Sequence, residues 1–366
     1  MIDKIINLVR AGFKTVTDPR RDNLSYPMAN LLNLSFAMFS LKDASLSAFK
    51  EQFSVRAENL HRVYGVDILP GDTALRESID EVNPKDLQKL FKPLLGFLRD
   101  KDVLKKRHVL GKYTVVSVDG TGHYCSGTKG CPQCMVKTHR NGKTSYYHQL
   151  LAAVAVHPEQ STVFPVACEA IVKQDGSTKN DCELNGSKRI IPQIRAVFGD
   201  AEQIITVFDA LYINGPHIIA LGAENLRYII GTKGQTYVDV QVEQLRKNND
   251  LQNVRELVAV ARARWKIENE TFNTLKNQGY QLEHNYGHGK KNLATNFAIL
   301  TFLAFFTDQI AQHLDKDFQA AKTVCKTFKA LWERIRSIFY LLPTMSMNAI
   351  YQFIIVRSQV NMPALE

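Results

Sequence analysis

The sequence lacks an apolar run long enough to cross a lipid bilayer. Its longest apolar stretch, Phe297–Phe306, is about ten residues and includes a threonine, whereas a transmembrane helix needs about 20. The N-terminal segment MIDKIINLVRAGFK carries an acid and a base among its first four residues. It has neither the apolar core nor the cleavage site of a signal peptide. These absences predict a cytoplasmic protein with no membrane partner.

Cysteine is sparse, and repeats and low-complexity tracts are missing. Six cysteines in 366 residues are too few for a disulfide framework, so we expect reduced thiols. The hydrophobic content of 45% and charged content of 22% are those of an ordinary globular protein. A chain of this length forms one large or two ordinary domains.

Basic charge is the one compositional excess. The formal net charge of +10 favours a polyanionic partner, either nucleic acid or an anionic membrane surface. Charge alone does not choose between them.

The pattern of apolar residues divides the chain into three parts. Residues 1–108 predict a helical region, and residues 291–366 predict a second one. From Tyr113 the pattern turns to short β-rich runs bounded by glycine. Over residues 109–290 the predicted order is three strands, helix, strand, helix, strand and helix. That order is typical of an α/β RNase H-like fold, a mixed sheet flanked by helices.

Three carboxylates mark the chemistry of this central part. One apolar run closes with Asp119 in VVSVDGTG, and another closes with Asp209 in IITVFDALY. Glu268 lies on the apolar face of a helix predicted over about 253–277. Carboxylates are rarely buried unless they are paired or bind a metal. Three of them at strand ends and on one helix predict a divalent-cation site of hard oxygens, suited to phosphoryl transfer.

At these motifs the sequence resembles DDE-type insertion-sequence transposases with an RNase H-like catalytic domain. The resemblance extends from about Asp18 to Ile310 and rests on DGTG, FDALYINGP and RARWKIENETFNTLKNQGYQLEHNYGHGK. Many of these transposases carry Tyr, two residues, Arg, three residues, Glu, six residues and Lys. Arg264 and Glu268 fit that spacing, whereas Ala261 replaces the tyrosine and Lys276 comes one position late.

The resemblance implies a function, a cofactor and partners. Asp119, Asp209 and Glu268 would be catalytic and would hold Mg²⁺ or Mn²⁺, as two ions. The partners would be double-stranded element ends and target DNA, bound by a homodimer on paired ends in the bacterial cytosol and nucleoid. Only residues 210–267 separate Asp209 from Glu268. The insertion usual in relatives is therefore either shortened to a segment near 235–252 or was never present in this branch.

Two other functions stay open, and the short span favours the first of them. One is a transposition-defective copy that acts as a DNA-binding repressor, and the other is a general RNase H-like nuclease.

Glu270 also competes with Glu268 as the metal ligand. Because two residues turn a helix by about 200°, only one of them faces the site. We expect Glu268 to do so and Glu270 to face solvent.

Further residues are candidates for DNA contact. Arg264 and Lys276 share the catalytic helix. Arg264 suits a DNA phosphate or the orientation of Glu268, and Lys276 suits a phosphate further along the DNA backbone. Stacking on a base suits Tyr212, and Lys233 suits a phosphate, although a core tyrosine and a surface lysine are equal alternatives. A glycine-containing turn carries the remaining candidates, His288, Lys290 and Lys291.

A cysteine-rich loop offers a second metal site. Cys125, Cys131, Cys134 and His139 lie within 15 residues, and this set could bind one tetrahedral Zn²⁺. Plain reduced thiols are the simpler alternative. A redox role is disfavoured because no thioredoxin-like βαβ pattern surrounds the Cys-x-x-Cys pair.

Overall fold

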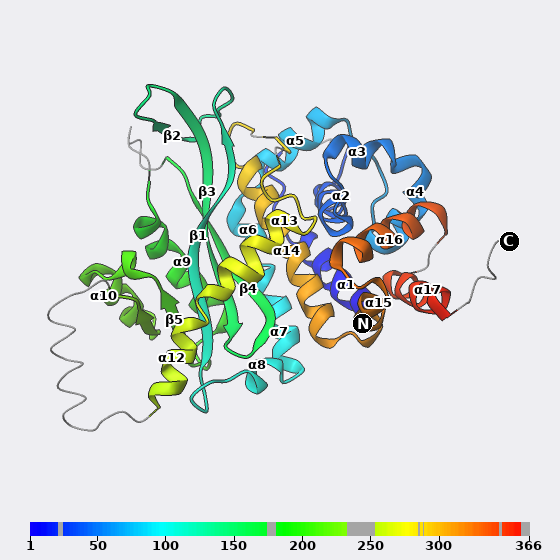
Figure 1. The fold of residues 1–366 in the computed structure, drawn as a ribbon. Helices are drawn as coiled ribbons and strands as arrows, with labels where there is room; N and C mark the ends of the chain where they lie inside the picture. The colour runs from blue at the N-terminus through cyan, green and yellow to red at the C-terminus, as the bar shows by residue number, and fades with distance from the viewer. Residues whose placement is uncertain are drawn as a thin grey trace. The chain divides into compact units, whose positions relative to one another are not determined.

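A computed structural model of the chain describes residues 1–20, 25–173, 181–232, 253–284, 286–287, 289–343 and 346–359 (Figure 1). The chain divides into two compact units, each made of separate segments. The first unit consists of Met1–Leu94, His123–Tyr147 and Asn273–Glu366, and the second of Leu95–Gly122 and His148–Phe272. The predicted insertion near 235–252 lies outside the described residues.

Helices occupy both ends of the chain, as expected. Before the sheet they are α1 (Ile2–Phe13), α2 (Met28–Leu41), α3 (Leu46–Glu51), α4 (Phe53–Asn59), η1 (Leu60–Tyr64), α5 (Asp72–Glu81), α6 (Pro84–Gln88), α7 (Phe91–Asp100) and α8 (Val103–Lys106). After the sheet they are α13 (Asn273–Asn277), α14 (Leu293–Leu314), α15 (Lys316–Cys325), α16 (Phe328–Leu341) and α17 (Met347–Gln359).

Helix α14 forms the centre of the first unit. It is 22 residues long and apolar enough to cross a membrane by length and composition, but 89% of its most apolar window is buried within the protein. It packs against α1, α2, α5 and α6, which belong to the same unit, and Figure 1 shows it in orange among them. This burial is that of a core helix.

The start of α14 is held by one buried carboxylate. Asp80, on α5, is 6% exposed and accepts hydrogen bonds from the backbone N–H groups of four successive residues, 290–293. Gly289 has φ +65°, and a Cβ there would lie 2.2 Å from the Asp80 carboxylate. The glycine-containing turn therefore lets the backbone wrap closely around Asp80.

The sheet has the strand order β2-β3-β1-β5-β6, with β4 paired to β3. Its strands are β1 (Thr114–Ser126), β2 (Met135–Thr138), β3 (Thr144–His157), β4 (Gln160–Ile171), β5 (Ile204–Phe208) and β6 (Arg227–Ile230). Strands β5 and β6 run parallel to each other, and β5 runs parallel to β1, whereas β3 is antiparallel to β2 and β4. The predicted RNase H-like mixed sheet with a helical N-terminal region is confirmed, and β2 is an additional short strand.

Helices of the second unit pack on the sheet. The α9 helix (Glu183–Phe198) packs on β4 and on α10 (Gly215–Ala223), which also contacts β6. The short 3₁₀ helix η2 (Ala210–Tyr212) follows β5. The single helix expected over 253–277 is instead divided into α12 (Val254–Arg262), the π-helix η3 (Ile267–Phe272) and α13. Such π-helical turns are short and occur frequently at functional sites.

Replacing Asp80 by alanine is expected to lower the free energy of unfolding by about 2–4 kcal/mol, because four backbone N–H groups lose a charged acceptor. Urea unfolding of the full chain, followed by circular dichroism, measures the change. Glu81→Ala is the matched control. Its exposed ion pair with Lys291 is expected to contribute less than about 1 kcal/mol. Equal losses in both variants would contradict the assigned role of Asp80.

Candidate active site

Asp119 and Asp209 come together because their strands are neighbours. Strands β1 and β5 are parallel, with Ser117 paired to Val207, and two residues further along this register lie the two aspartates. Adjacent strands are about 4.8 Å apart. Strand β1 continues beyond Asp119 to Ser126, so Asp119 marks the end of the pairing with β5 rather than the end of its strand.

Glu268 reaches Asp119 through a shared arginine. The Arg264 Nη1 atom donates to Asp119 Oδ2 at 3.0 Å and to Glu268 Oε1 at 3.1 Å. Arg264 precedes η3, and Glu268 lies within it, so the four-residue spacing seen in the sequence sets both side chains toward the site. No interaction of this kind involves Glu270 among the described residues. This geometry fits Glu268, rather than Glu270, as the carboxylate that faces the site.

Glu183 is a fourth carboxylate at this site, and sequence reasoning missed it. It begins α9, and its Oε1 atom accepts from Gln149 Nε2 at 2.5 Å while its Oε2 accepts from the Tyr212 hydroxyl at 3.1 Å. A Cβ on Gly120 would lie 2.3 Å from Glu183 Oε1, so the backbone beside Asp119 approaches this carboxylate closely. The only sequence signal was an acidic first helical turn, which normally reflects the helix dipole.

The carboxylates perturb one another because they are crowded and partly buried. Burial raises the pKa of Asp119 to about 6, and the charges of Glu268 and Glu183 add to this, against the opposing effects of the Gly120 amide and Arg264. Burial also raises the pKa of Glu183, with Asp209 contributing in the same direction. A concentration of negative charge with one arginine is the environment that a divalent cation would stabilise.

Backbone donors fix the direction of both aspartates. The Gly120 amide donates to Asp119 Oδ1 at 2.8 Å, and the Leu211 amide donates to Asp209 Oδ1, also at 2.8 Å. The second contact caps the 3₁₀ helix η2. The site is thus arranged by local backbone structure.

The residues predicted to contact DNA differ from one another in their surroundings. Tyr212 is fully buried and donates to Glu183, so its ring has no exposed face for a base. Lys276 pairs with Glu283 at 2.8 Å. The backbone amides of Lys290 and Lys291 bind Asp80. Two further candidates, Lys233 and His288, lie outside the described residues.

The structure brings together two of the four predicted zinc ligands. Cys131 and Cys134 have sulfur atoms 3.5 Å apart. His139 Nε2 instead contacts Ser145 Oγ at 2.7 Å, and Cys125 is exposed. The structure brings His148, which the sequence did not single out, to the two cysteines.

Comparison with known protein families identifies the family of this chain. Residues 110–306 match the family described as "Transposase DDE domain", which is more than half of the chain. The protein belongs to this family and is a DDE transposase, an enzyme class that acts on DNA with divalent metals.

One solved structure is also similar. It is the "Cryo-EM structure of piggyBac transposase synaptic complex with hairpin DNA (SNHP)", with a TM-score of 0.41 and 8% sequence identity. The match covers 100% of this chain and 80% of that one. No curated protein matches the sequence.

Asp119→Asn is expected to stabilise the metal-free protein at pH 8 by about 1–3 kcal/mol. The raised pKa of Asp119, about 6 against 3.8 for the ordinary group, means that the folded state holds this proton more tightly than the unfolded state. Its charge therefore destabilises the fold above pH 6, and the effect disappears below about pH 4. Urea unfolding in EDTA at both pH values measures the difference. A less stable variant at pH 8 would contradict the prediction.

Glu183→Gln is expected to weaken binding of Mn²⁺ by about tenfold or more, because a negative charge near Asp119 and Asp209 is lost. Isothermal titration calorimetry of the full chain measures this. Tyr212→Phe is the control, since it removes the hydrogen bond to Glu183 but keeps the charge. If both variants lose affinity equally, Glu183 acts by packing rather than by its charge.

Proposed function

We propose that this chain is the transposase of an insertion sequence, which binds the ends of its element, cleaves phosphodiester bonds and joins the 3′-hydroxyl to target DNA. The supporting observation is the convergence of Asp119, Asp209 and Glu268 in one unit, with Arg264 between two of them. Family membership identifies the chain as a DDE transposase. The site contains the three carboxylates that metal-dependent phosphodiester cleavage requires.

The donor set fits divalent cations of the Mg²⁺ type. Hard carboxylate oxygens are the ligands that Mg²⁺ and Mn²⁺ prefer. Burial raises the pKa of Asp119, and the charges of Glu268 and Glu183 raise it further. When bound, such ions lower the pKa of an attacking water or hydroxyl and stabilise the leaving oxygen. We propose Mg²⁺ or Mn²⁺ as two ions, held by Asp119, Asp209 and Glu268.

The protein's own residues orient these groups. Arg264 holds one oxygen each of Asp119 and Glu268, while backbone amides hold one oxygen of each aspartate. Each carboxylate therefore has its direction set before DNA arrives, which reduces the reorganisation needed during reaction.

Exposed basic and aromatic side chains on the helical segment before Glu268 support DNA binding. Arg255 and Arg262, on α12, are exposed and suit phosphate contacts. Trp265 is 55% exposed, and its ring lies 5.0 Å from the Arg264 guanidinium. Exposed aromatic rings stack on unpaired bases. We propose that this segment contacts the element end.

The proposal extends to assembly and location. A homodimer would hold paired ends, residues 1–108 would serve DNA binding and assembly, and residues 109–290 would perform catalysis. The net charge of +10 supports double-stranded DNA as the partner. The enzyme would act in the bacterial cytosol, on the nucleoid.

A strand-transfer assay tests the function. Labelled DNA from the two flanks of the gene, where the proposal places terminal inverted repeats, serves as the element ends, with Mg²⁺ and a supercoiled target. Wild-type protein is expected to nick the ends and join them to the target, and Glu268→Gln is expected to lower the rate by at least about 100-fold, since a metal ligand should matter more than its outer-shell partners. Glu270→Gln, two residues away, is the matched control and is expected to retain activity.

Three results would contradict the proposal. End binding without nicking by the wild type would favour a DNA-binding repressor. Cleavage of arbitrary duplex as fast as the terminal repeats would favour a general nuclease. Full activity of Glu268→Gln would remove this residue from the catalytic site.

A further inference from the structure

A tight turn brings two thiols together before β2. The Cys134 amide donates to the Cys131 carbonyl at 3.0 Å, which closes the turn. The Cys131 amide donates to Cys134 Sγ at 3.2 Å, and the two sulfur atoms are 3.5 Å apart. Thiolates at about 2.3 Å from a tetrahedral zinc lie about 3.8 Å apart. The turn therefore already has nearly the spacing of a two-cysteine metal knuckle.

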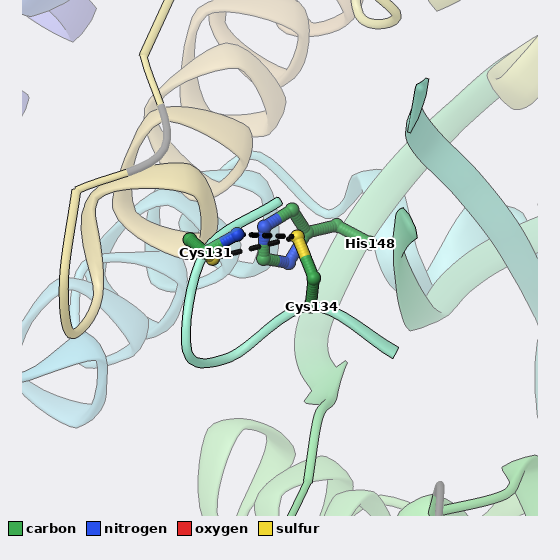
Figure 2. A group of neighbouring side chains, drawn as sticks. All are labelled: Cys131, Cys134 and His148. Atoms are coloured by element: carbon green, nitrogen blue, oxygen red, sulfur yellow. Dashed lines mark hydrogen bonds between the residues drawn. The ribbon is translucent and has the colours of Figure 1, made fainter. Parts of the chain in front are cut away.

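Strand pairing brings a histidine to the same place. Met135 is paired with Tyr147 in the β2–β3 hairpin, so the next residue of β3, His148, lies opposite Cys134. The ligand atoms of Cys131, Cys134 and His148 all lie within 4.8 Å of one another. Figure 2 shows the imidazole ring directed between the two cysteine side chains.

The surroundings of these side chains favour metal binding over free thiols in contact with solvent. Cys134 is 1% exposed and His148 is 2% exposed, whereas Cys131 is half-buried. The Cys131 amide directs its N–H group at Cys134 Sγ, a contact that also suits a metal-bound sulfur carrying negative charge. Two thiolates and a neutral imidazole balance the charge of Zn²⁺, so a buried ion would leave no net charge.

We propose that Cys131, Cys134 and His148 bind one Zn²⁺, with a water molecule as the fourth ligand on the more exposed side at Cys131. Binding releases the two thiol protons, and no electron transfer is involved. The ion fastens the turn before β2 to strand β3. It also fixes the segment that carries Lys129 and Lys137, two exposed lysines of the kind that attract a polyanion.

This ligand set differs from the one expected from spacing along the sequence. His139 lies five residues from Cys134 along an extended strand, which is about 16 Å, and its imidazole contacts Ser145 instead. His148 is 14 residues from Cys134 in the sequence but adjacent to it across the hairpin. The proposal rests on this local geometry and is independent of the function at Asp119.

Metal content of the purified full-length protein provides the test. Protein prepared with a phosphine reductant and no added chelator is expected to hold about one zinc per chain. Cobalt substitution is expected to give thiolate-to-cobalt charge-transfer absorption. Cys134→Ser and His148→Gln are each expected to weaken zinc binding at least about tenfold, measured by competition with a chromophoric chelator.

Matched controls separate this site from its rivals. Cys125→Ser and His139→Gln are expected to keep wild-type zinc affinity, and loss of zinc in either would favour the set expected from the sequence and overturn the proposal. Reduced wild-type protein that binds zinc no better than Cys134→Ser would also overturn it. If a buried variant fails to fold, as judged by circular dichroism, Cys131→Ser at the half-buried ligand gives the same comparison.

Discussion

The crowding of carboxylates beside the paired strands β1 and β5 is the constraint on which the second unit depends. Parallel pairing sets Asp119 beside Asp209, and Arg264 is the one cation that hydrogen-bonds to Asp119 among the described residues. Burial of Asp119, with the like charges of Glu268 and Glu183 added to it, raises the pKa of this group, so its ionised form destabilises the fold. A divalent cation bound at this place would offset that unfavourable free energy. Active sites commonly contain such destabilising groups.

The buried residues behind the site keep that arrangement in place. The Tyr212 ring packs against Phe208 and His217, with centroids 5.0 and 5.3 Å away, and its hydroxyl donates to Glu183. His217 in turn contacts Ser187 on the same helix as Glu183. The position of Glu183 is thus set by buried aromatic rings at the end of β5, so it follows from the core as much as from the site.

Charged groups have structural roles in the helical unit as well. The turn with Lys290 and Lys291 has the composition of a phosphate-binding loop, yet its backbone amides wrap around Asp80. Gly289 permits that approach. The backbone amides of this glycine-containing basic segment donate to the buried Asp80 carboxylate. Hydrogen bonds of the same kind would bind an external anion.

Sequence alone determined the features that depend on local pattern. Apolar runs and their closing residues predicted the strands, Asp119 and Asp209, and the four-residue spacing of Arg264 and Glu268 predicted their shared face. The tertiary structure decided what depends on pairing between distant segments. It brought Glu183 to the aspartates and His148 to Cys131 and Cys134, because helix packing and hairpin register place residues side by side whatever their separation along the chain.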